Sequence, residues 1–314
     1  MRRLFPVTDQ TPGRPRAVGA AGTGDAPAPV GTPAPVGTRV SAPTGRPAPA
    51  PDAPSVPALD APSAPAPDAP SAPAQDREWS LDELADAYAY PAGPAVWLRA
   101  NMVSALDGAA QHEGRSQPLS NATDMRIFGT LRGLADVVVV GAETVRQEGY
   151  RPARAREAFA ARRSAAGQGP APAVAVVSAG LDLDFGLPLF TEPLVPSLLV
   201  TGASAPADRL AAARAAGVEV VIAGDGAAVE PARAVRALAD RGLRRLLTEG
   251  GPRLLGQFVA AGVLDELCLT LSPMLTAGTA QRIAGGPDLP VPERFSLGSL
   301  LEEDGFLFAR YHRG

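Results

Sequence analysis

Residues 131–146 read LRGLADVVVVGAETVR, and they contain the strongest structural signal in this chain of 314 residues. Within them, residues 136–140 (DVVVV) form a continuous run of β-branched side chains, which is typical of a strand covered on both faces. Just before that run, residues 123–132 place apolar side chains at helical spacing, and Asn121 is a suitable N-cap. Gly141 follows the run directly and permits a tight turn close to a ligand. The segment therefore predicts a helix, a buried strand and a turn in succession.

The same alternation of strands and helices extends in both directions. Ser80 and Glu83 form a capping-box pattern, which predicts a helix over residues 81–88. Further strands are expected at residues 97–104, 173–177, 197–201, 218–222, 245–248 and 266–271, and further helices at residues 207–216, 230–241 and 252–261. Such alternation favours an α/β fold with three α/β/α layers and a mostly parallel sheet. Residues 306–311 (FLFARY) are expected to add an antiparallel strand at the C-terminal edge.

The composition changes sharply near residue 77. Residues 8–76 are mostly Pro, Ala, Gly, Ser and Thr, and they repeat PAPVGT twice and an octet DAPSxPAx three times. Such a segment cannot bury enough apolar surface to offset its chain entropy, so we expect a disordered Pro/Ala-rich linker. A Pro-rich ligand for a partner protein is the alternative. Residues 1–7 (MRRLFPV) are a possible docking segment for the globular domain, which is expected over residues 77–314.

Charge and residue usage exclude several classes of function. A net charge of -4 without a basic tract argues against nucleic-acid binding. Apolar runs shorter than the roughly 18 residues of a membrane span, and an N-terminus without a secretory signal, indicate a cytoplasmic protein with no membrane partner. A single cysteine, Cys268, and only two histidines, His112 and His312, argue against disulfides and metal centres. The sequence contains no lysine, which excludes Schiff-base catalysis.

Ligands of open α/β sheets bind beyond the C-terminal ends of the strands, and the clearest candidate residues follow the strand at 245–248. Gly250, Gly251 and Pro252 precede an amphipathic helix, and free N–H groups there would cradle a phosphate or pyrophosphate. We expect Glu249, at the strand end, to face a neutral donor such as a pyrimidine or a ribose hydroxyl. A plain surface carboxylate is the alternative.

Two other strand ends carry candidate residues. Beyond Gly141, the hydroxyl of Thr144 is a weaker ligand candidate, because an ordinary strand-to-helix turn explains this segment as well. Asp107 is a weak catalytic candidate, since Asp-Gly is also a common turn signal. Ser116 lies in a polar loop that enters a helix and could hold a phosphorylated substrate. Arg132 is a candidate anion contact, unless it only balances the dipole at the helix C-terminus.

These segments together resemble the reductase domain of the bifunctional riboflavin deaminase/reductase and its stand-alone relatives. The matching stretches are SALDG at 104–108, GRS at 114–116, residues 131–146, LTEGGPRLLG at 247–256 and VLDELCLTLSP at 263–273. The resemblance implies a dihydrofolate-reductase-like fold, NADPH as the cofactor and a homodimer. It also implies reduction of 5-amino-6-(5-phosphoribosylamino)uracil, by hydride transfer to C1′ of its ribosylamino group, to a ribitylamino product. Because the deaminase half is missing, a separate deaminase is expected in the same pathway.

The resemblance also implies roles for individual residues at the matching positions. NADPH contacts are implied at Val103, Thr144, Ser178 and the segment that runs from Gly251 through Pro252, Arg253, Leu254 and Leu255. Substrate contacts are implied at Asn101, Ser116, Arg132 and Glu249.

Two departures from the family pattern leave the substrate open. Glu148 would replace an aspartate near the cofactor, and Pro118 stands where an aromatic residue can cover it. One alternative is a reductase of another heterocycle, such as dihydrofolate, on the same scaffold. A second alternative is a non-catalytic nucleotide-binding protein.

Overall fold

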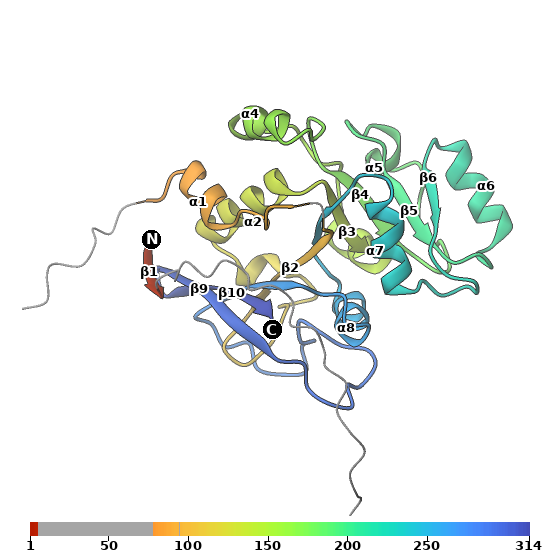
Figure 1. The fold of residues 1–314 in the computed structure, drawn as a ribbon. Helices are drawn as coiled ribbons and strands as arrows, with labels where there is room; N and C mark the ends of the chain where they lie inside the picture. Colours follow the sequence, from red (N-terminus) through yellow and green to blue (C-terminus); the bar gives the residue numbers. More distant parts are fainter. Residues whose placement is uncertain (6–77, 94) are drawn as a thin grey trace, which may run out of the picture. The chain divides into compact units, whose positions relative to one another are not determined.

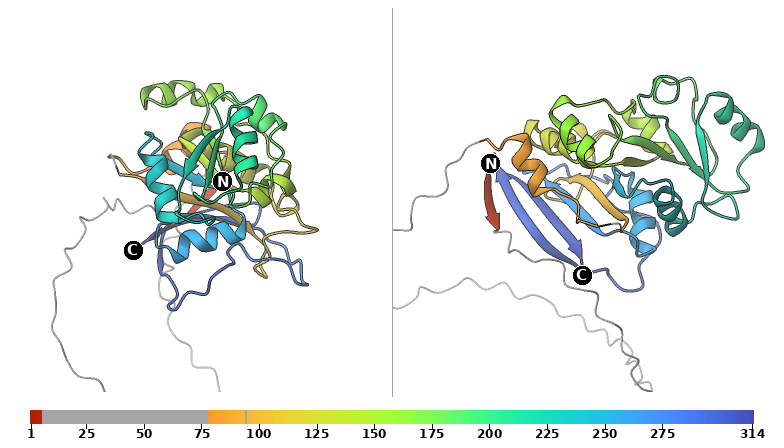
Figure 2. Two further views of the ribbon diagram at one scale, coloured as in Figure 1. Left: turned by 90° about the vertical axis from the view of Figure 1, so that its right-hand side faces the viewer. Right: turned by 45° about the horizontal axis from the view of Figure 1, so that its top comes forward.

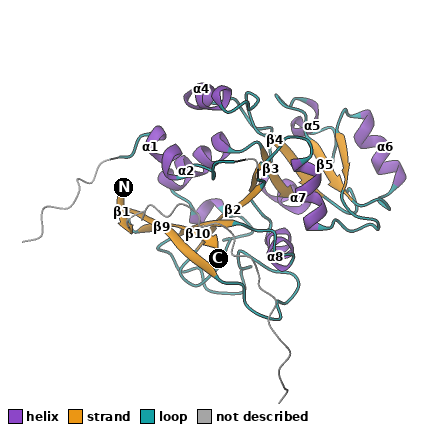
Figure 3. Ribbon diagram, in the orientation of Figure 1, coloured by secondary structure: helices purple, strands orange, loops and turns teal. Residues whose placement is uncertain are grey.

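The computed structural model describes residues 1–5, 78–93 and 95–314. The disorder expected for residues 8–76 lies outside these residues. The described part builds a ten-stranded sheet with helices packed on both of its faces (Figures 1 and 3). The three-layer α/β arrangement expected from the sequence is therefore confirmed.

The sheet is parallel over most of its width and antiparallel at one end. Its strands lie in the order β1 (Arg2–Phe5), β9 (Phe295–Glu303), β10 (Phe306–Arg313), β8 (Glu266–Leu271), β2 (Trp97–Ser104), β7 (Arg245–Thr248), β3 (Val137–Gly141), β4 (Ala173–Val177), β5 (Leu198–Thr201) and β6 (Glu219–Ile222). Every pair from β8 to β6 is parallel, whereas β10, β9 and β1 pair antiparallel. The antiparallel end is wider than expected, because β9 and β1 lie beyond β10.

The helices cover the two faces in unequal numbers. They are α1 (Leu81–Ala87), α2 (Ala122–Leu134), α3 (Ala142–Glu148), α4 (Glu157–Ala165), α5 (Pro188–Thr191), α6 (Ala207–Ala215), α7 (Pro231–Ala239) and α8 (Pro252–Ala260). Val137 and Val139 of β3 point to the core beneath α7 and α8. Val138 and Val140 point to the opposite face, which the other helices cover. The valine run is therefore buried on both sides, as its composition predicts.

The cap signals read from the sequence are confirmed. Ser80 and Glu83 form the capping box of α1. The Asn121 side chain accepts the backbone N–H of Asp124 at 2.8 Å and so begins α2. The helices α3 and α4 lack a side-chain cap, and β9 contains a glycine and three acidic or polar residues, so local pattern did not predict these elements.

The first residues of the chain join the sheet. β1 pairs with β9, next to the long antiparallel strands (Figure 2). The amino group of the buried Met1 forms an ion pair with Glu303 at 3.2 Å. Glu303 also accepts a hydrogen bond of 2.6 Å from Thr123 of α2. The start of the expected docking segment is thus tied to the core, while Pro6 and Val7 lie outside the described residues.

A buried ion cluster joins the parallel and antiparallel parts of the sheet. Arg99 of β2 and Glu266 of β8 have fully buried side chains, with Nε and Oε1 2.9 Å apart. Arg310 of β10 donates to the same carboxylate at 2.5 Å, and Trp97 donates to it at 2.8 Å. Burial opposes the charge of Glu266, but the two guanidinium groups lower its pKa to about 2. This cluster fixes β2, the strand that carries one wall of the site.

Candidate functional site

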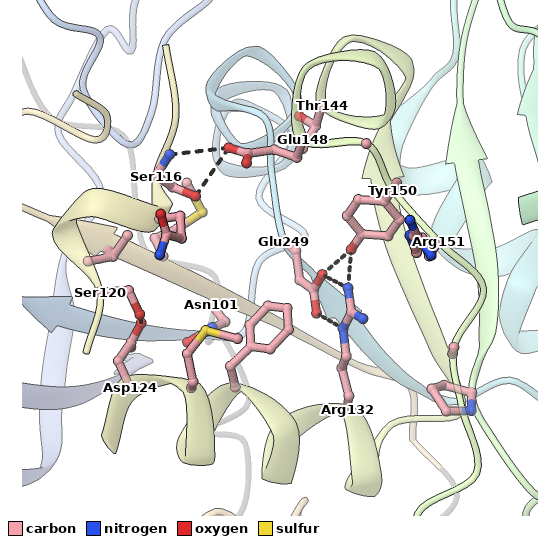
Figure 4. Close-up of a pocket in the computed structure, with 18 of the residues that line it drawn as sticks. Asn101, Ser116, Ser120, Asp124, Arg132, Thr144, Glu148, Tyr150, Arg151 and Glu249 are labelled. Atoms are coloured by element: carbon pink, nitrogen blue, oxygen red, sulfur yellow. Dashed lines mark hydrogen bonds and ion pairs between the residues drawn. The ribbon is translucent and has the colours of Figure 1, made fainter. Parts of the chain in front are cut away.

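A cavity of about 660 Å³ opens beyond the C-terminal ends of the central strands. Its walls come from β2, α2, α3, the loop 149–156 and the turn between β7 and α8 (Figure 4). Ligands of open α/β sheets bind at this edge. The cavity collects nine of the residues singled out from the sequence, namely Asn101, Val103, Ser116, Arg132, Thr144, Glu148, Glu249, Gly251 and Pro252.

One side of the cavity holds a compact charged cluster. Arg132 grips Glu249 with two hydrogen bonds, Nε to Oε1 at 2.7 Å and an outer nitrogen to Oε2 at 2.6 Å. The hydroxyl of Tyr150 accepts a third bond from Arg132 at 2.8 Å and itself donates to Glu249. The guanidinium also lies over the Phe128 ring, 4.4 Å from its centre. The four side chains therefore form one unit (Figure 4).

Electrostatics keep this unit charged and hydrogen bonded. Burial opposes the charge of Arg132, but the adjacent Glu249 raises the pKa of the guanidinium above its ordinary value. Burial, and then Glu249, raise the pKa of the Tyr150 hydroxyl well above the usual range, so it stays a donor. The expectation that Glu249 faces a neutral donor is thus only half met, because a cation holds its carboxylate. Equally, the fork of Arg132 is engaged before any phosphate arrives.

Ser116 and Glu148 meet at another wall of the cavity. Glu148 accepts hydrogen bonds from the backbone N–H and the hydroxyl of Ser116, at 3.2 Å and 3.1 Å. The two residues come from the loop before α2 and from the end of α3, so they link the two walls. Ser116 shares no hydrogen-bond partner with Arg132 in the described structure, although both line the same cavity.

The opposite side of the cavity contains a carboxyl group that sequence reasoning missed. Asp124 lies in the first turn of α2, is 7% exposed and lines the cavity. Ser120 and Thr270 donate hydrogen bonds to its two oxygens, at 2.5 Å and 2.6 Å. Burial raises the pKa of Asp124, and the two hydroxyl groups only partly oppose this. An acidic residue in a first helical turn is common, so the sequence alone did not mark it.

The turn before α8 forms a narrow cradle beside α3. Gly250 has φ +94°, a conformation that requires glycine, and its peptide bond to Gly251 is cis. A Cβ at Gly251 would lie 2.8 Å from the hydroxyl oxygen of Thr144. Gly141 also belongs here, because its N–H donates to the Gly250 carbonyl at 2.9 Å. The cradle therefore fits a group that needs close approach to the backbone, as a pyrophosphate does.

The start of α8 adds donors to this cradle. Its first backbone bond runs from Leu255 N to Gly251 O at 3.0 Å, so the N–H groups of Arg253 and Leu254 have no partner within the helix. Leu254 and Leu255 bury their side chains in the core and can reach a ligand only through the backbone.

Two candidates do not reach the cavity. Asp107 accepts the N–H groups of Thr276 and Ala277 at 2.9 Å and 2.7 Å, and these bonds lower its pKa. It holds a loop, so the turn-forming interpretation replaces the catalytic one. Ser178 lies at the end of β4, and its hydroxyl accepts the N–H of Leu181 at 3.0 Å.

The loop after α3 brings three further cations to the cavity, which the sequence analysis did not consider. Arg151, Arg154 and Arg156 line the cavity and are exposed. Within the described ranges, no ion pair neutralises them. The EGYRPARAR segment contains alternate arginines, and this pattern was the available signal.

Metal binding and membrane spanning find no support in the described residues. Among them, no three His, Cys, Asp or Glu side chains gather closely enough to hold a metal ion. In the same part of the chain, no helix combines the length and apolar character required to cross a membrane.

Comparison with known proteins places this cavity in a reductase setting. Residues 96–300 match the model of the RibD C-terminal domain. The 2,5-diamino-6-ribosylamino-4(3H)-pyrimidinone 5′-phosphate reductase of Archaeoglobus fulgidus is 26% identical over 179 residues, which cover 57% of this chain and 80% of that protein. The protein of the same name from Methanothermobacter thermautotrophicus is 29% identical over 189 residues, covering 60% and 82%.

The solved structures agree. A pyrimidine reductase-like protein from Corynebacterium diphtheriae is 30% identical, with a TM-score of 0.64 over 70% of this chain and 92% of that one. This likeness confirms the fold expected from the sequence.

Proposed function

The chain belongs to the RibD C-terminal domain family, and on that premise we propose that it is an NADPH-dependent pyrimidine reductase of riboflavin biosynthesis. It reduces the ribosylamino group of a phosphorylated aminopyrimidine to a ribitylamino group. The observation that carries this proposal is a single cavity that joins a glycine cradle to a charged cluster. A cofactor and a phosphorylated polar substrate can meet there.

The cofactor fits the side of the cavity formed by α3 and α8. The N–H groups of Arg253 and Leu254, together with the Thr144 hydroxyl, bind its phosphates beside Gly251. Val103 and Pro252 line the same region and exclude water. When bound, the nicotinamide supplies the hydride that reduces C1′ of the substrate.

The substrate fits the remaining part of the cavity. Arg151, Arg154 and Arg156 attract the phosphate dianion, since they are not committed to carboxylates. Arg132 then acts mainly through Glu249 and Tyr150, which present hydrogen-bonding groups to the ribose or the base. Ser116 lines the neighbouring wall. As C1′ is reduced, its bond to the ring oxygen opens, and that oxygen takes a proton.

Three further features of the proposal rest on the family resemblance. We propose a homodimer, a cytoplasmic location and a separate deaminase that serves the same pathway. Sedimentation equilibrium of the purified protein tests the first of these, with a monomer at micromolar concentration as the contrary result.

Nicotinamide absorbance gives the direct test of the activity. The purified chain is mixed with NADPH and, in turn, a phosphoribosylamino-pyrimidine, its unphosphorylated form and dihydrofolate. Rapid oxidation with the phosphorylated pyrimidine is expected. Preference for dihydrofolate would instead assign the chain to a different reduction, and tight NADPH binding without any turnover would favour a non-catalytic role.

A further inference from the structure

Asp124 is the one buried carboxyl on the cavity wall that has no role in the proposed reaction so far. It is 7% exposed, and its acceptor groups are only partly used. A carboxylate offers about four lone-pair sites, whereas Ser120 and Thr270 fill two. Burial raises its pKa, which means that the charged form is short of hydrogen-bond donors. A ligand with two parallel N–H groups would supply them.

The surroundings of Asp124 suit a flat heterocycle. Met102, Met125 and Phe128 line this part of the cavity with thioethers and an aromatic ring. Asn101 adds an amide on the same side of the cavity as Asp124 (Figure 4). Ligand pockets commonly combine apolar walls with a few polar groups that fix orientation.

Helix α2 also orients a substrate from end to end. Asp124, Phe128 and Arg132 are four residues apart, so they share one face of the helix. At 1.5 Å per residue, Asp124 and Arg132 lie about 12 Å apart along the axis. The anionic end thus faces the site of the base, and the end near Arg132 and Arg151 faces the site of the phosphate (Figure 4).

We propose that Asp124 recognises the N–H-rich edge of the pyrimidine and selects a substrate that still carries its 2-amino group. In a 2-amino-4-pyrimidinone, the N3–H and the 2-amino group form two parallel donors, which a carboxylate accepts together. In the corresponding uracil, O2 replaces the amino group and is repelled by the carboxylate. A site built to bind a donor discriminates strongly against an analogue that lacks it.

This inference rests on the proposed function and refines it. It exchanges the uracil substrate suggested by the sequence for the diaminopyrimidinone. It also sets the order of the reactions, because hydrolytic removal of the 2-amino group must then act on the ribitylamino product.

The test compares both substrates with wild-type protein and Asp124→Asn. The substrates are 2,5-diamino-6-ribosylamino-4(3H)-pyrimidinone 5′-phosphate and 5-amino-6-(5-phosphoribosylamino)uracil, each with NADPH. Wild-type protein should prefer the 2-amino substrate in kcat/KM by roughly 10- to 150-fold. Asp124→Asn should lose most of this preference, because an amide can face O2 as well as an N–H. The matched control is Asp265→Asn, since Asp265 binds the backbone of Leu98 at 2.8 Å away from the cavity.

A binding experiment without turnover separates recognition from folding. Calorimetry with 2,5,6-triaminopyrimidin-4-one and 5,6-diaminouracil should show the same preference, again lost in Asp124→Asn. Thr270→Val, which keeps the carboxylate but removes one of its supports, should weaken the preference less.

Each outcome has a distinct meaning. Equal losses for both substrates in Asp124→Asn, or a wild-type preference for the uracil, would overturn the role of Asp124. If wild-type protein reduces neither substrate, the proposed function itself fails.

Discussion

Replacing Gly251 by alanine tests the cofactor cradle at its tightest point. The backbone of Gly251 has φ -74° and ψ -176°, which alanine adopts without strain. The added Cβ would lie 2.8 Å from the Thr144 hydroxyl oxygen, whereas ordinary contact begins at 3.4 Å. The hydroxyl must therefore move by about half an ångström, and the change acts on the cradle rather than on folding.

The size of the effect follows from the contact that is disturbed. A hydrogen bond to a charged group contributes about 1.5–3 kcal/mol, which corresponds to roughly 10- to 150-fold in affinity. Gly251→Ala should weaken NADPH binding within this range. Thr144→Ala should cause a similar loss. The double variant should be little worse than either single one, because both changes act through the same contact.

Fluorescence titration with NADPH and thermal melting are the assays. Gly226→Ala is the matched control, since its Cβ would meet nothing within 4 Å. Unchanged NADPH affinity in Gly251→Ala, at an unchanged melting temperature, would refute the cradle. Fully additive losses would show that Thr144 and Gly251 act separately.

Three other predictions concern the phosphate end and the buried cluster. Replacing both Arg151 and Arg154 by alanine should raise KM about 10-fold or more for the phosphorylated substrate, while KM for its unphosphorylated form stays the same; equal increases would contradict phosphate binding. Glu266 has its pKa lowered from 4.5 to about 2, so its charged form stabilises the fold above pH 4.5 and this stabilisation is lost as the pH falls towards 2. The loss should reach roughly 3 kcal/mol in urea titrations at successive pH values and should be absent in Glu266→Gln, which should itself be destabilised by about 3–5 kcal/mol at neutral pH. Burial raises the pKa of Cys268 to about 12, so a thiol reagent should label it only when the protein unfolds, and rapid labelling of native protein would be the contrary result.

Local pattern was sufficient for most of the central sheet. The bounds of β2, β7 and β8 agree with the sequence analysis, because each is a short apolar run followed by a turn or a polar residue. Ser80 and Asn121 marked helix starts through side-chain chemistry that acts within three residues. Residues 142–148 carry no such cap, and their helix depends on contacts that Ala142 and Val145 make with the core.

The site was only partly predictable for a different reason. Glycine turns at strand ends are visible in a sequence, so Gly141, Gly250 and Gly251 were found directly. The partner of a charged side chain is not visible when the two residues are far apart. Arg132 and Glu249 are 117 positions apart, and only the pairing of β3 with β7 brings them together.

By itself, then, the sequence determined the α/β class, the ends of the central strands and the glycine cradle, because these depend on neighbouring residues. The tertiary structure alone decided which charges are free. It committed Arg132 to Glu249 and Tyr150, turned Asp107 towards a loop, and left Arg151 and Arg154 without a carboxylate partner in the described chain. It also buried Asp124 between Ser120 and Thr270, which lie 150 residues apart in the chain but meet across α2 and β8. Burial and pairing are properties of the packed sheet and its helices, and they decide how a charged side chain can act.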